Sequence, residues 1–338
     1  MKKASFLATV FGITVLLFSN CKENNTDQPT TEKEQSIDSL LVEFPDSISL
    51  LLKRGNDYFT ELKYDLALPD GARAFRLDSN NLEARVLYAD VINNKLGRTI
   101  KEVQQAQRHY KFIITKQPKN TRALVGLAST YLFQQDFDRT FQYANEALRI
   151  DPKVRDAYVL KGTAYMILEN TELAKSSYET AVQQDPNFYL AYFRLAQIYQ
   201  AENNPQCVEY FVTAQKLNPN DLEFKYQVAF SKETHGQIEG AKEMYREMAT
   251  DTVDIYVSRG LFHQGYIKQF VENDLDSALY FYKSALETEP RYVEAWYNLA
   301  LAHESKGNIS QALTAYGNCL KYNPEFEAAR IRANKLKY

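Results

Sequence analysis

The feature that most constrains this chain is a pattern that returns along it at a nearly constant spacing. Pro118, Pro152 and Pro186 are 34 positions apart, and the interval from Pro290 to Pro324 is the same. Internal periods of roughly 20–50 residues are typical of proteins that stack copies of one small structural unit. The sequence therefore predicts an array of repeats.

The stretch 155–186 predicts that each unit is a pair of helices joined by a tight turn. Tyr158 and Gly162 lie four positions apart on one face of a first helix, and Ala174 and Tyr178 do the same on a second. The glycine and the alanine leave room for the two backbones to approach at the crossing, while tyrosines fill the space around them. The proline that closes the unit ends the second helix.

The residues of the last unit carry a recognisable signature. The chain resembles the tetratricopeptide repeat (TPR) family, whose signature W-x2-L-G-x2-Y…A-x3-F…P is matched with Ala300 in place of Gly and His303 in place of Tyr. The matching residues are Trp296, Leu299, Ala300, Ala312, Tyr316 and Pro324. The resemblance implies an all-α fold: a right-handed superhelical solenoid of about eight helix-turn-helix repeats with a C-terminal end helix.

The N-terminal segment reads as a secretory signal. Two lysines precede an apolar run from Ala4 to Phe18, which is shorter than the about 20 residues that cross a bilayer. Cys21 follows, and the segment resembles a bacterial lipoprotein signal, in which such a cysteine is acylated after cleavage on its amino side. Asn20 and Phe18 depart from the small residue and the leucine of that motif. The alternative is an uncleaved anchor.

These features divide the chain into four predicted segments. The polar stretch after the cysteine carries too little apolar surface to fold and is expected to be a disordered tether. The segments are the lipoprotein signal peptide 1–20, the lipidated Cys21 with its tether 21–46, the TPR array 47–326 and the C-terminal capping helix 327–338.

Three places depart from a regular repeat. Pro69 and Gly71 fall inside the second helix of the first repeat, where an interior proline costs about 3 kcal/mol, so a break or kink is expected. Extra turn residues lie around 93–99. The register is hardest to place in 250–270, where the proline is missing, residues are added and Gly265 sits one position early.

Composition and motifs argue against several classes of function. The net charge of −3 and the absence of a basic run argue against a nucleic-acid partner. Cys207 and Cys319 occupy positions that hold alanine in other repeats, which predicts buried thiols. Sequence motifs of zinc proteases, dithiol redox proteins, serine hydrolases and phosphate-binding loops are missing, and the four histidines are scattered. No enzymatic activity, cofactor or metal is therefore expected.

The resemblance also implies a concave groove lined by the first helix of each repeat, at its second, fifth, ninth, twelfth and thirteenth positions. Residues at these positions are apolar or aromatic more often than charged, which is typical of a groove for an apolar helix or extended peptide. Each can equally pack against the neighbouring repeat. The positions at which TPR co-chaperones carry cations for a C-terminal carboxylate hold neutral side chains, so that binding mode is not expected. The candidate groove residues are Phe59, Val125, Phe133, Val159, Met166, Phe193, Tyr226, Phe230 and Tyr297.

The sequence thus predicts a non-enzymatic TPR scaffold that binds a protein or peptide partner and is held to a membrane by a lipid anchor. The expected location is a bacterial cell envelope, most simply the periplasmic or outer face of the outer membrane, in an assembly, secretion or cell-wall process. The alternative is a small-ligand or glycan-binding lipoprotein beside an outer-membrane transporter. A scaffold predicts a contiguous apolar groove, a glycan binder a closed pocket with paired aromatics, and an enzyme a cleft with converging titratable groups.

Overall fold

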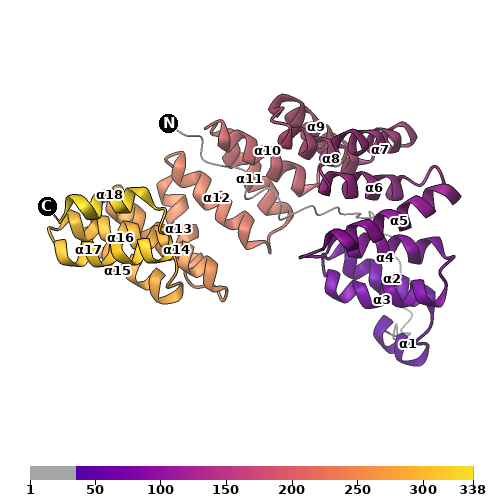
Figure 1. Cartoon of the computed structure of the whole chain (residues 1–338), viewed down its shortest axis with the longest axis horizontal. Coiled ribbons are helices and arrows are strands. Elements are labelled where there is room, and N and C mark those ends of the chain that lie inside the picture. The colour runs from indigo at the N-terminus through magenta and orange to yellow at the C-terminus, as the bar shows by residue number, and fades with distance from the viewer. Residues whose placement is uncertain (1–35, 338) are drawn as a thin grey trace, which may run out of the picture. The chain divides into compact units, whose positions relative to one another are not determined.

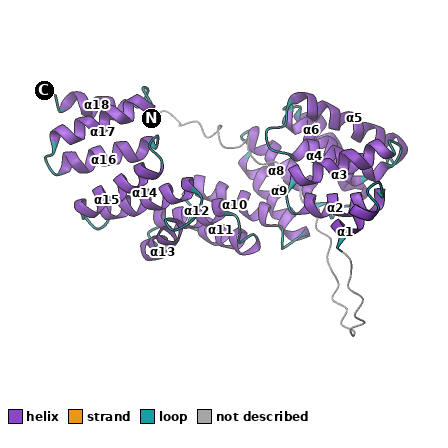
Figure 2. Cartoon of the chain, turned by 90° about the horizontal axis from the view of Figure 1, so that it is seen from below, coloured by secondary structure: helices purple, strands orange, loops and turns teal. Residues whose placement is uncertain are grey.

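All regular structure in the described part of the chain is helical. The computed structural model describes residues 36–337, which form eighteen helices, and the chain divides into two compact units at Pro186 and Asn187. Figures 1 and 2 show successive helices folding back on one another within each unit. The predicted all-α solenoid of helix pairs is confirmed, whereas the predicted signal peptide and Cys21 lie outside the described residues.

The first unit contains nine helices. The first is short, and the other eight form four successive pairs. They are α1 (Ile37–Glu43), α2 (Ile48–Thr60), α3 (Tyr64–Leu77), α4 (Leu82–Asn94), α5 (Ile100–Lys116), α6 (Thr121–Phe133), α7 (Phe137–Ile150), α8 (Arg155–Ile167) and α9 (Thr171–Gln184).

The second unit contains four further pairs and an end helix. They are α10 (Tyr189–Ala201), α11 (Gln206–Leu217), α12 (Leu222–Thr234), α13 (Ile238–Met248), α14 (Asp254–Phe270), α15 (Leu275–Thr288), α16 (Val293–Ser305), α17 (Ile309–Tyr322) and α18 (Glu327–Lys335).

Within each unit the even-numbered helices form an inner layer. Each packs against its own pair partner, and contacts between successive even-numbered helices join α2 with α4, α4 with α6, α6 with α8 and α14 with α16. The odd-numbered helices cover the outer side, and α18 packs on α17. The inner layer is therefore the surface on which the predicted groove residues lie.

Polar side chains fix where many helices begin. Asn81, Asn120 and Asn170 accept hydrogen bonds from backbone N–H groups of the first turns of α4, α6 and α9. Thr99 and Glu102 form a reciprocal capping box at the start of α5. These caps accept hydrogen bonds from backbone N–H groups that have no partner within the helix. Each of these helices can therefore begin directly after a short loop.

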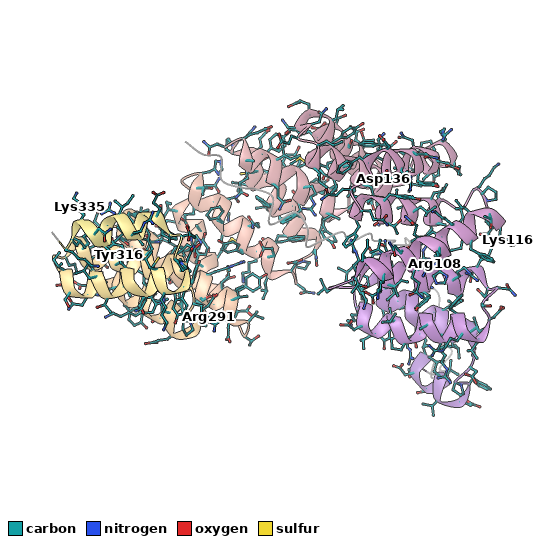
Figure 3. All side chains as sticks on the ribbon, in the orientation of Figure 1. Arg108, Lys116, Asp136, Arg291, Tyr316 and Lys335 are labelled. Atoms are coloured by element: carbon teal, nitrogen blue, oxygen red, sulfur yellow. The ribbon has the colours of Figure 1, made fainter. Side chains whose placement is uncertain are left out.

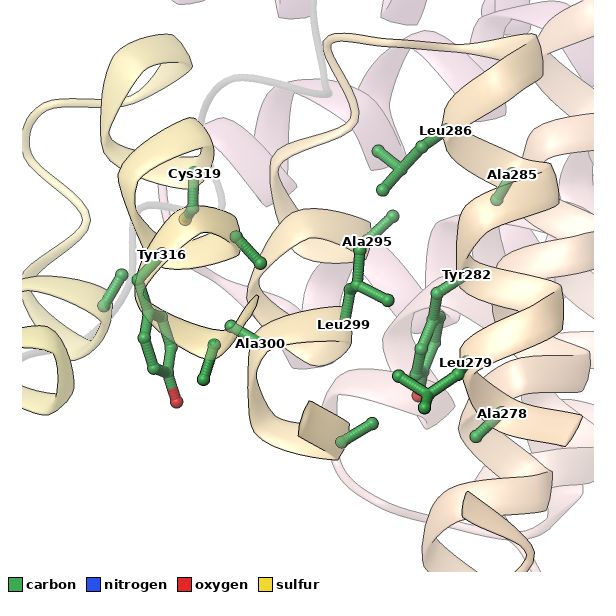
Figure 4. Packing of buried hydrophobic residues seen from close by; sticks show 14 of the residues in the cluster. Ala278, Leu279, Tyr282, Ala285, Leu286, Ala295, Leu299, Ala300, Tyr316 and Cys319 are labelled. Atoms are coloured by element: carbon green, nitrogen blue, oxygen red, sulfur yellow. The ribbon is translucent and has the colours of Figure 1, made fainter. Parts of the chain in front are cut away.

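A small residue facing a tyrosine ring is the recurring contact inside the pairs. A Cβ placed on Gly162 would lie 2.7 Å from Cε1 of Tyr178, and one on Gly265 would lie 2.8 Å from Cε1 of Tyr282. In the last pair Ala300 and Tyr316 are both buried and lie close together in Figure 4. The sequence predicted that Gly162 would face Ala174, whereas its close neighbour is the tyrosine ring.

Order begins earlier than the predicted tether allows. Residues 37–43 form α1, capped by Ser36, and Leu41 is buried against the first pair. Asp38 of this helix accepts a hydrogen bond from Nη1 of Arg54 at 2.7 Å. The prediction of a disordered segment extending to residue 46 is therefore wrong for α1, because Ile37 and Leu41 give it an apolar face that packs on the array.

The expected break at Pro69 does not occur, because α3 runs unbroken from Tyr64 to Leu77. Pro69 is exposed, so its ring meets solvent and the helix loses a single backbone hydrogen bond. Asp70 is buried and accepts two hydrogen bonds from Arg54, at 2.8 and 2.7 Å. A Cβ on Gly71 would lie 3.3 Å from Leu87, so this glycine allows α4 to pack closely.

The other two departures are accommodated in loops and helix ends. The extra residues around 93–99 lengthen the turn between α4 and α5. In 250–270 the contact of Gly265 with Tyr282 repeats that of Gly162 with Tyr178, which makes Ser258 the counterpart of Arg155. The added residues therefore form the loop before α14 and an extra first turn of that helix.

The two glycine environments give a matched stability test. We expect Gly265→Ala to lower the free energy of unfolding by about 1–2 kcal/mol, because the new methyl group meets the buried Tyr282 ring. Gly317→Ala, on an exposed position of α17 with open space around it, should raise stability by about 0.5–1 kcal/mol through helix propensity. Urea unfolding measures both. Equal effects of the two substitutions would contradict this packing account.

Candidate functional site

The nine predicted groove residues divide into two groups by exposure. Four are at most 4% exposed and belong to the hydrophobic core, so their side chains hold the repeats together. They are Phe59, Val125, Val159 and Phe193. The other five are half-buried and face the surface of the inner layer; they are Phe133, Met166, Tyr226, Phe230 and Tyr297. For these five the groove stays a prediction.

In the first unit the ninth position of each inner helix is polar. Asn56, Asp90, Ser129 and Thr163 occupy it on α2, α4, α6 and α8. Ser129 accepts a hydrogen bond from Nδ2 of Asn93 at 3.2 Å. Polar side chains thus run along the inner layer of this unit, and we call these four residues the polar row.

Asp90 is the centre of the polar row. It is 3% exposed and accepts hydrogen bonds from Tyr110 Oη and Arg122 Nε, each at 2.6 Å. Arg122 also donates to Asn56 Oδ1 at 3.2 Å. Burial raises the pKa of Asp90, and the Arg122 charge opposes that shift. The Arg122 guanidinium is therefore engaged by side chains of the chain itself.

Asp156, at the second position of α8, is a buried carboxyl group with little compensation. It is 3% exposed, and its Oδ1 has no hydrogen-bond partner among the described residues. Nε of Arg155 lies 4.0 Å from that oxygen, and Arg155 also pairs with Asp185. Burial raises the pKa of Asp156 to about 7, and the nearby Asp90 charge adds to the rise. This group therefore titrates near neutral pH.

In the second unit the inner helices carry aromatic side chains instead. Tyr226 and Phe230 of α12 stack with ring centroids 6.1 Å apart, and Tyr266 and Phe270 of α14 lie 4.7 Å apart. Tyr266 is 37% exposed and Phe270 is 48% exposed. Tyr297 follows at the fifth position of α16. We call these five residues the aromatic row.

A hydrogen-bonded network lies beneath the aromatic row. His263 is buried between α12 and α14, with Nδ1 2.8 Å from Glu233 Oε2 and Nε2 3.2 Å from Tyr226 Oη. The Arg259 guanidinium lies 4.7 Å from the centroid of the Tyr226 ring and pairs with Glu223 at 3.0 Å. Burial raises the pKa of Tyr226 to about 12, so its hydroxyl stays protonated near neutral pH. The network fixes the orientation of Tyr226.

Sequence reasoning missed several residues of the two rows and their surroundings. Asp90 and Asn93 are the ninth and twelfth residues of α4, so the groove positions would have found them if they had been applied to 82–94. Asp156 is the second residue of α8, as Arg122 is of α6. Tyr266 and Phe270 lie in the segment of uncertain register, although Gly265 marks the position just before the ninth. The link from His263 to Glu233 had no local signal, because it joins two repeats.

No group of three or more His, Cys, Asp or Glu side chains in the described residues is arranged to hold a metal ion. Among the helices of residues 36–337, none is both long and apolar enough to traverse a bilayer. Cys207 and Cys319 are buried free thiols, as predicted.

Comparison with known proteins identifies the repeats. Three segments match models of the tetratricopeptide repeat, at residues 101–154, 156–188 and 293–326. The crystal structure of the APC/C hetero-tetramer Cut9–Hcn1 is similar in fold, with a TM-score of 0.58 and 15% sequence identity over 88% of this chain and 57% of that chain.

Two curated proteins illustrate the sequence similarity. Anaphase-promoting complex subunit 3 of Schizosaccharomyces pombe is 24% identical over 184 residues, which are 54% of this chain and 27% of that protein. The human protein O-mannosyl-transferase TMTC3 is 25% identical over 201 residues, which are 58% of this chain and 19% of that protein. This chain thus spans about a quarter or less of either relative.

The raised pKa of Asp156 predicts a pH dependence of stability. The folded state binds this proton more tightly than the unfolded state, whose pKa is near 3.8, so the stabilisation present at low pH is lost as pH rises through about 7. We expect Asp156→Asn to be more stable than wild type at pH about 8, by at most on the order of 4 kcal/mol, with convergence only below the unfolded-state pKa of 3.8.

Thermal or urea unfolding across this pH range measures the effect. The exposed Asp138→Asn on α7 is the matched control and should follow the wild-type profile. A stability difference between Asp156→Asn and wild type that stays constant with pH would contradict the assignment.

Proposed function

We propose that this tetratricopeptide-repeat protein is a non-enzymatic scaffold that binds a protein or peptide partner on the inner layers of its units. TPR similarity to anaphase-promoting complex subunit 3 and to the Cut9–Hcn1 assembly supports a role in protein interaction. The transferase named among the relatives is a longer protein, of which this chain spans 19%. Its activity is therefore not carried over to this chain.

The aromatic row is the observation that carries the proposal. Aromatic side chains that are more than a third exposed on a helix face contribute little to folding, yet they supply large contact areas for an apolar partner. Tyr266 and Phe270 meet this description, and the neighbouring Tyr226 is held in place from below by His263. Such a preorganised surface fits an apolar helix or extended segment.

We further propose that the scaffold is lipid-anchored through Cys21 and works in a bacterial envelope process. The support is the sequence: two lysines, a short apolar run, a cysteine and a polar stretch. One acyl chain binds a membrane only marginally, whereas two or three chains give stable attachment. The alternative function is binding of a small ligand or glycan on the same aromatic row. The crosslinking experiment and glycan screen below distinguish it from the scaffold.

Groove binding predicts that exposed aromatic residues can be removed without harm to the fold. We expect Tyr266→Ser with Phe270→Ser to reduce crosslinking to the partner in expressing cells at least tenfold, because each loses a contact worth about 1 kcal/mol or more. Tyr280→Ser, on an exposed position of the outer helix α15, is the matched control and should retain the partner.

Quantitative mass spectrometry of crosslinked complexes gives the readout, and circular dichroism confirms the fold of each variant. Retention of every partner by the double variant would contradict the groove proposal. Absence of any protein crosslinked to wild type, together with binding in a glycan screen, would favour the alternative.

The lipid anchor is tested at its single attachment site. We expect Cys21→Ser to remain unacylated and to lose membrane attachment, since the sulfur that carries the acyl group is gone. Fractionation of cells that express the whole chain measures attachment, and labelling with an alkynyl fatty acid measures acylation. Wild-type protein without label, or a variant acylated to the same extent, would contradict the anchor.

A further inference from the structure

The turn between α4 and α5 is longer than its counterparts in the first unit. It spans residues 95–99, whereas the turns after α2, α6 and α8 each comprise three residues, 61–63, 134–136 and 168–170. Gly97 adopts a positive φ of 64° in open space and allows the chain to reverse beyond the helix ends. The two additional residues therefore extend the loop into solvent.

The extended loop exposes aliphatic side chains. Leu96 is 86% exposed and Ile100, the first residue of α5, is 49% exposed. At this exposure Leu96 adds almost nothing to the hydrophobic core. Leu168, in the corresponding turn after α8, is 48% exposed and is followed by Glu169 rather than by cations.

The exposed face of α5 continues from the loop and is basic. At 100° per residue, Ile100, Lys101, Gln104, Arg108 and Lys111 share an arc of about 100°, and the last four are all exposed. Arg108 and Lys116 lie along this helix in Figure 3.

Acidic residues are scarce around this face. The single acid of α5 is Glu102, which is occupied by Lys95 at 2.6 Å and by the backbone of Thr99 at 2.7 Å. The sequence then contains no Asp or Glu until Asp136. The stretch 103–135 therefore carries positive charges only, although Glu146 of α7 lies near Tyr143 as Lys111 does.

We propose that this surface, formed by Leu96, Ile100, Lys101, Arg108 and Lys111, docks on an anionic phospholipid membrane. Segments that bind at a membrane surface combine two features. Apolar side chains insert at the boundary between headgroups and acyl chains, and cations bind the anionic headgroups. The inference goes beyond the proposed scaffold and does not rest on acylation of Cys21. It would orient the first unit on the membrane.

A membrane fits this surface better than an acidic protein segment does. Leu96 lies in the extended loop and is 86% exposed, and Ile100 begins α5 and is 49% exposed, so a flat lipid surface can reach both side chains. The cations follow one side of a single helix, so they can reach one plane of headgroups together. An acidic protein segment is therefore the competing outcome of the test.

The strength of such binding can be bounded. Each Lys or Arg near an anionic leaflet contributes about 1 kcal/mol, a factor of about five in the partition constant, and the contribution falls off within a Debye length. Replacing two cations with glutamates adds repulsion to that loss. We therefore expect Arg108→Glu with Lys111→Glu to weaken binding by at least about 25-fold.

The test uses the chain from Lys22 to Tyr338, which keeps every described helix but lacks the apolar N-terminal run and Cys21. Vesicles of phosphatidylcholine, with and without phosphatidylglycerol, are sedimented with the protein at low and high salt. We expect binding to the anionic vesicles alone, weakened by salt. Leu96→Ser with Ile100→Ser should also weaken it several-fold, whereas the matched control Leu168→Ser should not.

Circular dichroism confirms that each variant is folded. Absence of wild-type binding to anionic vesicles, equal binding to neutral vesicles, or undiminished binding by both double variants would overturn the proposal. Capture of the protein by immobilised poly-glutamate without vesicle binding would overturn it too and would assign the surface to an acidic protein segment. These outcomes leave the scaffold proposal untouched, because its partner is tested through Tyr266 and Phe270.

Discussion

The contact between a small residue and a tyrosine ring is the constraint on which the rest of the structure depends. Gly162 beneath Tyr178 and Gly265 beneath Tyr282 leave no room for a methyl group. This contact holds the pairs α8–α9 and α14–α15 together, and each pair buries its apolar face against its own partner and its immediate neighbours. The regular spacing of small residues and tyrosines in the sequence reflects this local contact.

Packing of the inner layer determines which of its residues are left for a partner. Val125 and Val159, at the fifth positions of α6 and α8, are buried in the core of the first unit. At the same fifth position α12 and α16 carry Tyr226 and Tyr297, which are only half-buried. Equivalent positions therefore serve stability in one repeat and remain available for binding in another.

The repeats, their helix pairs and their buried cysteines could be predicted from the sequence, because each depends on residues close together in the chain. The break expected at Pro69 did not occur, since Arg54 from the preceding helix holds Asp70 and the close approach of α4 requires Gly71. Helix propensity depends on neighbouring residues in the sequence, whereas the tertiary packing that overrides it involves residues of other helices. For the same reason the link from His263 to Glu233 was beyond a position-by-position reading.

The two units place different chemistry on equivalent surfaces. Asp90 and Arg122 satisfy one another across α4 and α6, so the polar row of the first unit is largely occupied by its own hydrogen bonds. Buried charges that are paired in this way give geometric specificity more readily than net stability. In the aromatic row, by contrast, Tyr266 and Phe270 remain more than a third exposed. Under the proposed function, a partner with apolar side chains gains most from the second unit, and the basic face of α5 suits the first unit to contacts on its outer side.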